Sequence, residues 1–265
     1  MPGFDAVSSR YARDSTVQRT AAEVLLRLAP VGPRDDVLDV GCGTGALVAR
    51  VRALTSGRVV GVDPSAGMIA AARRDAPPGV ALERRAAEDL PYRAEFDLAL
   101  SNSALQWFHD VARALARVRA ALRPGGRAAI QAPATRLYCP EFVEAMEDVA
   151  RDPRTAAAWA TFRSPWFFRE SADAYAALLE AADLRVSVAR VDELVARETP
   201  EGALRVYGSG AAQGYLDPDC YPAPLPAGFA DAVRDIVRAA LARRAGADGR
   251  LDLRFRRVFL VARAA

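Results

Sequence analysis

The chain has 265 residues, of which 51% are hydrophobic and 26% charged, a composition that indicates a globular protein with a sizeable core and argues against long disordered stretches. Its formal net charge is +3, from 36 basic and 33 acidic residues, and because the sequence has no lysine all of those basic residues are arginine. No stretch combines a basic stripe with interleaved aromatic residues, so we expect no nucleic-acid partner.

The three cysteines, Cys42, Cys139 and Cys220, are far apart and follow neither a metal-ligand spacing nor a disulfide framework, so we expect no metal site. Residues 1–19 are polar and lack the apolar stretch of a signal peptide. No apolar run approaches the length of a membrane span. These features predict a cytoplasmic protein with no membrane partner.

From about residue 36 the chain alternates strand-like apolar runs with helical patterns, which predicts a parallel sheet with helices on both faces. The predicted strands lie at residues 36–40, 58–63, 80–85, 97–102 and 128–132, and the predicted helices at 45–53, 66–75 and 111–122. Pro124, Gly125 and Gly126 follow the last of these helices and turn the chain into the fifth strand.

After residue 133 the pattern changes to an aromatic-rich helical stretch, a helix at 171–182, a strand at 185–197, an irregular span rich in Gly and Pro at 199–228, a helix at 229–244 and a last strand at 251–262. The last two strands flank an insertion of about fifty residues, which is long for a connection inside one domain and is typical of a lid or of a packing embellishment. We therefore predict one domain at 1–265, with a helical cover at 1–35, a core at 36–135 and a substrate-side half at 136–265 that carries the insertion at about 199–247.

The most informative stretch is an apolar strand that runs into a glycine-rich turn, Val37-Leu38-Asp39-Val40-Gly41-Cys42-Gly43-Thr44-Gly45. Its glycines also satisfy a loose dinucleotide pattern, so they do not by themselves decide the ligand. Asp39 does help, because a carboxylate at this place repels a pyrophosphate and attracts the ammonium and sulfonium of S-adenosylmethionine (SAM). Asp63, at the end of the second strand, is placed to accept hydrogen bonds from both ribose hydroxyls.

This stretch, together with Gly61-Val62-Asp63-Pro64-Ser65 followed by Met68 and with Leu122-Arg123-Pro124-Gly125-Gly126, resembles class I SAM-dependent methyltransferases. The resemblance implies an α/β fold with a Rossmann-like, doubly wound, mostly parallel seven-stranded sheet, an antiparallel last strand and a helical lid insertion. It also implies SAM as cofactor, S-adenosylhomocysteine as its product, and cofactor contacts at Asp39, Gly41, Gly43, Asp63, Pro64 and Met68.

One position departs from the family pattern. Many members carry an aspartate after the third strand that accepts from the adenine amino group, and Ala86 stands at that place here. The resemblance then leaves two alternatives for this contact, the side chain of Glu88 or the backbone of Ala87.

The fourth strand ends in Ser101-Asn102-Ser103-Ala104-Leu105-Gln106-Trp107, and the carboxyl end of a central strand borders the ligand crevice in such sheets. We therefore expect Ser101 and Asn102 near the methyl donor. The Ala-Leu-Gln-Trp run resembles the branch that contains trans-aconitate, malonyl-acyl-carrier-protein and juvenile hormone acid methyltransferases, which implies methyl esterification of a carboxylate. Tyr11, Ser15 and Gln18 look similar to the leading helix of that branch, which folds over the cofactor.

A carboxylate acceptor is ionised at neutral pH and needs no general base, so alignment of donor and acceptor supplies most of the catalysis. His109, the single histidine, is a candidate base, or else a polar residue before a helix that Asp110 caps. Arg136 and Arg205 are candidates to pair with a substrate carboxylate.

Four aromatic residues, Trp107, Tyr138, Trp166 and Phe167, are candidates to wall the acceptor pocket or else ordinary core residues, and Gln106 is a further candidate contact. The predicted function is methyl transfer from SAM to a small molecule, with a carboxylate as the leading acceptor. The alternatives are an O-, N- or C-methyltransferase of natural-product synthesis, a SAM-binding protein that does not methylate, and an NAD-type oxidoreductase.

Overall fold

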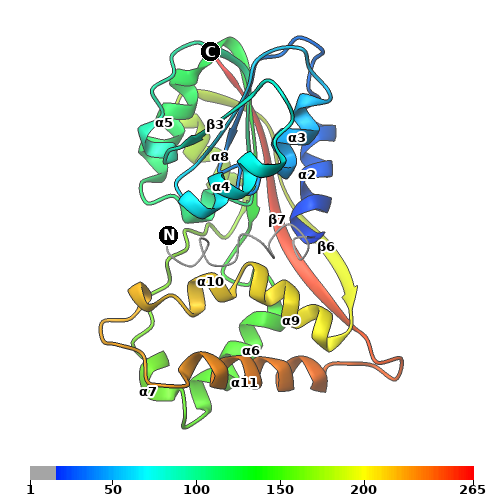
Figure 1. Ribbon diagram of the computed structural model, residues 1–265, viewed down its shortest axis with the longest axis vertical. Helices are drawn as coiled ribbons and strands as arrows, with labels where there is room; N and C mark the ends of the chain where they lie inside the picture. The colour runs from blue at the N-terminus through cyan, green and yellow to red at the C-terminus, as the bar shows by residue number, and fades with distance from the viewer. Residues whose placement is uncertain (1–15) are drawn as a thin grey trace.

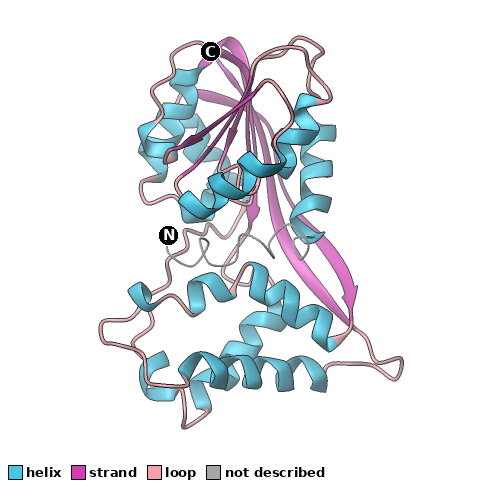
Figure 2. Cartoon of the chain, viewed as in Figure 1, coloured by secondary structure: helices cyan, strands magenta, loops and turns pink. Residues whose placement is uncertain are grey.

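The computed structural model describes residues 16–265, which form a twisted sheet covered by helices and a separate layer of helices below one end of that sheet (Figures 1 and 2). Tyr11 and Ser15 lie outside the described residues.

The sheet has seven strands in the order β3-β2-β1-β4-β5-β7-β6. The first five are β1 (Val37–Val40), β2 (Val59–Asp63), β3 (Val80–Arg84), β4 (Phe96–Asn102) and β5 (Leu122–Pro133), and each pairs with its neighbour in parallel. The last two are β6 (Leu184–Glu198) and β7 (Leu251–Ala264), and β7 runs antiparallel to both β5 and β6. The prediction of a seven-stranded, mostly parallel sheet with an antiparallel last strand is confirmed.

Both faces of the sheet are covered because its central strands are apolar on both sides: every residue of β1 and β2 is buried. One face packs against α2 (Thr16–Leu28), α3 (Ala46–Arg52) and α4 (Ala66–Asp75), and the other against α5 (Val111–Ala121) and α8 (Ala172–Glu180). The two helix groups lie on opposite sides of the sheet in Figure 1.

The helical layer consists of α6 (Pro140–Arg151), α7 (Ala156–Trp159), α9 (Pro200–Ser209), α10 (Ala212–Tyr215), the short 3-10 helix η3 (Pro218–Cys220) and α11 (Phe229–Arg243). Strands β6 and β7 continue past the other strands and reach down to it (Figure 1). The layer has its own apolar core, in which Phe142, Tyr207, Val233 and Phe255 are buried together. It is therefore held together by its own packing as well as by the two long strands.

One sequence prediction needs correction in this layer. The span predicted to be irregular at 199–228 begins with the helices α9 and α10 and is irregular only toward its end, at 221–228. Thr199 caps α9 by accepting from the Gly202 amide and Pro200 begins the helix, an arrangement that overrides the helix-weakening glycines. The segment between β6 and β7, predicted as an insertion at about 199–247, forms only part of the layer. The segment of α6 and α7 belongs to it as well, since the apolar face of α6 packs on α11.

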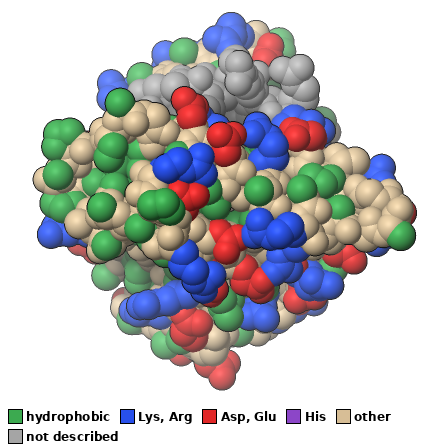
Figure 3. Space-filling model, turned by 90° about the horizontal axis from the view of Figure 1, so that it is seen from below, with side chains coloured by type: hydrophobic (Ala, Val, Ile, Leu, Met, Phe, Trp, Pro, Cys, Tyr) green, Lys and Arg blue, Asp and Glu red, His purple; other side chains and the backbone are tan. Residues whose placement is uncertain are grey.

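The underside of the helical layer carries basic and acidic side chains that are interspersed rather than separated by sign (Figure 3). Several are paired, such as Arg234 with Asp231 at 2.7 Å and Arg238 with Asp235 at 2.8 Å along α11. Within residues 16–265 the structure has no helix that is long and apolar enough to cross a membrane.

Candidate functional site

The glycine-rich turn after β1 lies at the carboxyl ends of the central strands. Gly41 has φ 80° and its amide donates to Val62 O at 2.8 Å, so the turn is fastened to β2. A Cβ at Gly41 would overlap the Cβ of Ala104, and Gly43 also has a positive φ of 54°. These positions therefore need glycine both for backbone conformation and for space.

Asp63, at the end of β2, organises the same turn. Its Oδ2 accepts from the Gly43 amide at 3.0 Å and its Oδ1 from the Ser65 amide at 2.9 Å. Ser65 in turn caps α4 by accepting from the Met68 amide at 3.0 Å. Asp63 therefore connects the glycine-rich turn to the start of α4, and it lines a cavity beside that turn.

Asp39 is the most unusual polar residue in this region. It is 1% exposed, and neither carboxylate oxygen has a hydrogen-bond partner within the described part of the chain. Burial, and to a lesser extent the charge of Asp63, raises the pKa of Asp39 to about 7. A buried carboxylate without partners is costly, and a cationic ligand relieves that cost. The site therefore fits a ligand with positive charge, as SAM has.

Two adjoining cavities surround this turn and share Gly41, Gly43 and Asn102. The first is also lined by Asp63, Pro64, Met68, Arg85, Ala86, Ala87, Glu88, Ser103, Ala104, Trp107, Phe108 and His109. The second is also lined by Gln18, Arg19, Thr20, Ala22, Glu23, Asp39, Cys42, Thr44, Ala46, Leu47 and Arg50. Residues of the first would hold the adenosine of SAM, and those of the second, acidic and basic together, its zwitterionic amino-acid end.

Almost all of the predicted cofactor residues that the structure describes line these cavities. Ser101 is the exception, because it is buried within β4 and lines neither of them. Its neighbour Asn102 lines both. Asn102 Nδ2 donates to Gln18 O at 3.1 Å and so ties α2 to the cleft.

The short 3-10 helix η1 (Ala87–Asp89) lies beside the first cavity. Glu88 Oε1 accepts from the amides of His109 and Asp110 at 2.8 and 3.2 Å, so this side chain holds the turn before α5. Ala87 and Glu88 both line the first cavity, so both alternatives for the adenine contact stay predictions. Asp110 caps α5 by accepting from the Arg113 amide, and His109 is exposed at the cavity rim.

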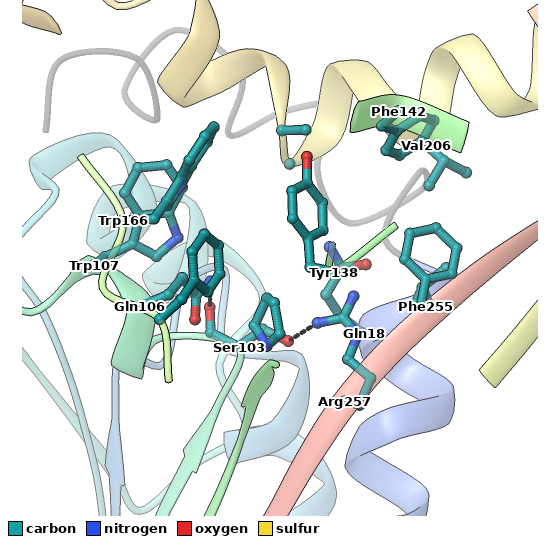
Figure 4. A pocket seen from close by; sticks show the side chains of 15 residues that line it. Gln18, Ser103, Gln106, Trp107, Tyr138, Phe142, Trp166, Val206, Phe255 and Arg257 are labelled. Carbon is teal, nitrogen blue, oxygen red and sulfur yellow. Dashed lines mark hydrogen bonds between the residues drawn. The ribbon is translucent and has the colours of Figure 1, made fainter. Parts of the chain in front are cut away.

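A third cavity, which we call the interlayer cavity, lies between the sheet and the helical layer (Figure 4). It is lined by Val17, Gln18, Ser103, Gln106, Trp107, Pro133, Tyr138, Phe142, Trp166, Phe168, Val206, Gly210, Ala211, Phe255 and Arg257. Ser103 and Trp107 line this cavity and also the first cofactor cavity. An acceptor in the interlayer cavity would therefore lie next to the cofactor cleft.

Ser103 is held firmly at this junction although its φ of 59° is unusual for a residue with a side chain. Its amide donates to Gln131 O at 2.8 Å and its hydroxyl to Gln131 Oε1 at 2.9 Å. The Ser103 carbonyl accepts from Gln106 Nε2 at 2.8 Å. Such a strained conformation costs about 1 kcal/mol and is common at functional sites, where surrounding hydrogen bonds enforce it.

Arg257 is a candidate acceptor-binding residue that the sequence did not single out. It is 4% exposed, and its guanidinium extends from β7 into the interlayer cavity, where it donates to Ser103 Oγ at 3.3 Å (Figure 4). Among the described residues that line this cavity, Arg257 is the one cation and none is acidic. A signal was present: Arg257 continues the alternate, inward-facing series of Leu251, Leu253 and Phe255.

The two arginines that the sequence suggested lie elsewhere. Arg136 is exposed at an aromatic groove on the outside of the helical layer, and its amide is bound to Glu170. Arg205 is exposed on α9 and does not line the interlayer cavity. The structure does bring four other predicted acceptor residues, Gln106, Trp107, Tyr138 and Trp166, into that cavity, whereas Phe167 lines the aromatic groove instead.

Comparisons with known proteins agree with this geometry. A methyltransferase-domain family model matches residues 37–126. A trans-aconitate 2-methyltransferase from Methylobacterium nodulans is 35% identical over 99% of both chains, and a malonyl-acyl-carrier-protein O-methyltransferase from Hahella chejuensis is 38% identical over 47% of this chain and 46% of that one. The structure of the YcgJ protein from Bacillus subtilis is similar in fold, with a TM-score of 0.61 at 16% identity over 92% of this chain and 98% of that one. The chain belongs to the class I SAM-dependent methyltransferases, in the branch that contains the trans-aconitate and malonyl-acyl-carrier-protein enzymes.

Proposed function

We propose that this methyltransferase esterifies a carboxylate of a small molecule held in the interlayer cavity. The observation that carries the proposal is the buried guanidinium of Arg257, which extends into that cavity and contacts Ser103 beside the cofactor cleft. A guanidinium presents paired donors that match a carboxylate, and its attraction for that anion is strong in a buried site.

Methylation of a carboxylate requires the protein mainly to bind and align the two reactants. When bound, SAM supplies an electrophilic methyl group, to which a carboxylate oxygen bonds as the carbon–sulfur bond breaks and its electron pair remains on sulfur. No proton moves, so no general base is needed, in keeping with the position of His109 outside the interlayer cavity. Arg257 would fix the carboxylate, and Ser103 would hold the guanidinium in place.

The names of two relatives, for trans-aconitate and for a malonyl-carrier protein, support a carboxylate acceptor as well.

The test uses methyl-labelled SAM, the purified enzyme and small-molecule extracts. Products are treated with base and volatile methanol is trapped, because a methyl ester releases its label and an ether, amine or carbon-methylated product does not. Released label supports the proposal, and base-stable label would favour an O-, N- or C-methyltransferase of natural-product synthesis.

Arg257→Gln tests the assigned residue. It removes a charge-assisted contact of about 2 kcal/mol, so we expect ester formation to lose roughly thirtyfold in kcat/KM while SAM affinity is unchanged. Arg263→Gln is the matched control, because Arg263 is on the same strand but exposed, where its side chain makes one long contact with Gly125 O at 3.4 Å. Equal activity of the two variants would remove Arg257 from the proposal.

A further inference from the structure

We infer that the acceptor is a carboxylic acid with one anionic group and an apolar, ring- or chain-bearing body, and that Trp166 selects that body. This inference rests on the proposed function, because it takes Arg257 as the site of the carboxylate. It separates this chain from an enzyme for polycarboxylates, such as the trans-aconitate for which some of its relatives are named.

The charge inside the interlayer cavity favours a single carboxylate. Arg257 is the one charged residue among the described residues that line the cavity, and most of the others are aromatic or aliphatic. One guanidinium can pair with one carboxylate. A second or third carboxylate on the same molecule would lie against apolar side chains, where an ion without a counter-charge is strongly disfavoured.

The shape of the cavity favours an apolar body. In Figure 4 the aromatic rings of Trp107 and Trp166 stand on one side of Arg257, and Phe142 and Phe255 on the other. A carboxylate fixed at Arg257 therefore leaves the remainder of the acceptor between aromatic surfaces. Flat or hydrocarbon groups gain most from such surroundings.

Trp166 is held at the edge of the interlayer cavity by its neighbours. Its ring meets those of Tyr215 and Trp107 edge to face, with centroid distances of 4.7 and 5.7 Å. The ring lies directly on Gly214 of α10, where a Cβ would overlap its six-membered part. Gly214 thus provides the space that Trp166 occupies.

Three aromatic residues separate the interlayer cavity from a second apolar space. Tyr138, Trp166 and Phe168 line the interlayer cavity and also the outer groove of the helical layer, in which Trp159 and Phe162 stack at 4.9 Å. Displacement of Trp166 would join the two spaces, so this residue sets how long an apolar body the enzyme accepts.

The experiment is calorimetric titration of the enzyme saturated with S-adenosylhomocysteine, using 3-phenylpropionate, octanoate, 3-phenylpropionamide and trans-aconitate. We expect at least one of the two apolar acids to bind tenfold or more tightly than trans-aconitate. Equal or tighter binding of trans-aconitate, or no binding of either apolar acid, overturns the inference. The amide tests the proposed function separately: if it binds as tightly as 3-phenylpropionate, recognition of the carboxylate by Arg257 fails, whatever the ranking of the acids.

Two variants test the role of Trp166. Trp166→Ala removes the indole ring. Gly214→Ala keeps the ring but displaces it, because the new Cβ would overlap it. We expect each to weaken the preferred apolar acid at least fivefold and to change trans-aconitate binding by less than twofold. An equal loss for both ligand classes in a variant with wild-type SAM affinity shows a general structural effect and contradicts selection by Trp166.

Discussion

Asp39→Asn is the perturbation that most directly tests the electrostatics of the cofactor site. The wild-type carboxyl is buried, has no hydrogen-bond partner among residues 16–265, and titrates with a pKa raised to about 7 from an ordinary value of 3.8. Asparagine has nearly the same shape but no charge at any pH. The substitution therefore removes the titration and leaves the packing.

The raised pKa fixes the sign of the effect on the ligand-free protein. The folded state binds the Asp39 proton more tightly than the unfolded state does. The contribution of this proton to the free energy of unfolding is therefore fully present below pH 3.8 and is lost as the pH rises through 7. The full shift corresponds to about 4 kcal/mol of unfolding free energy, of which about 3 kcal/mol falls between pH 5 and pH 8. Asp39→Asn should lose this pH dependence and become the more stable protein above pH 7.

Thermal unfolding without SAM measures this directly. Between pH 5 and pH 8, we expect the melting temperature of the wild type to fall relative to that of Asp39→Asn by roughly 6–12 °C. Asp75→Asn, at an exposed carboxylate on α4, is the control and should follow the wild type. Calorimetry should also show wild-type SAM affinity rising with pH through 7, as the ionised carboxylate meets the cationic ligand. Parallel melting curves for the wild type and Asp39→Asn would refute the reasoning.

The other predictions concern single residues of the cleft. Gly41→Ala should abolish SAM binding, measured by calorimetry, with little loss of helix content by circular dichroism, because its Cβ would overlap Ala104 in the turn rather than in the core; retained SAM affinity would contradict the assignment of this turn. Asp63→Ala should weaken SAM binding by about 2 kcal/mol through loss of the ribose acceptor, and unchanged affinity would show that β2 does not border the ribose. His109→Ala should leave ester formation within about threefold of wild type in a labelled-methyl assay; a thousandfold loss with the fold intact would instead indicate an acceptor that must be deprotonated.

The sequence was sufficient for the sheet and for most of the cofactor site. Strands such as β1 and β2 are continuous apolar runs because both of their faces are buried, and that pattern is local. The glycine turn and Asp63 lie at the ends of two adjacent parallel strands, where the Gly41 amide donates to Val62 O and the Gly43 amide to the Asp63 carboxylate. Asp39 and Asp63 could therefore be predicted from their positions at strand ends, and Met68 from the family resemblance.

What the sequence could not determine is which distant segments meet at the acceptor side. The helical layer assembles from α6 and α7, which precede β6, and from α9 to α11, which follow it, because their apolar faces can be buried only against one another. The sequence did not distinguish Arg257 from the other arginines, and only the structure shows that β7 places it beside Ser103. Arg136 and Arg205 were candidates from the sequence, but the structure shows that both are exposed. Side-chain periodicity indicates which face of a strand a residue occupies. Only the packing of the two layers decides whether that face borders solvent, core or cavity.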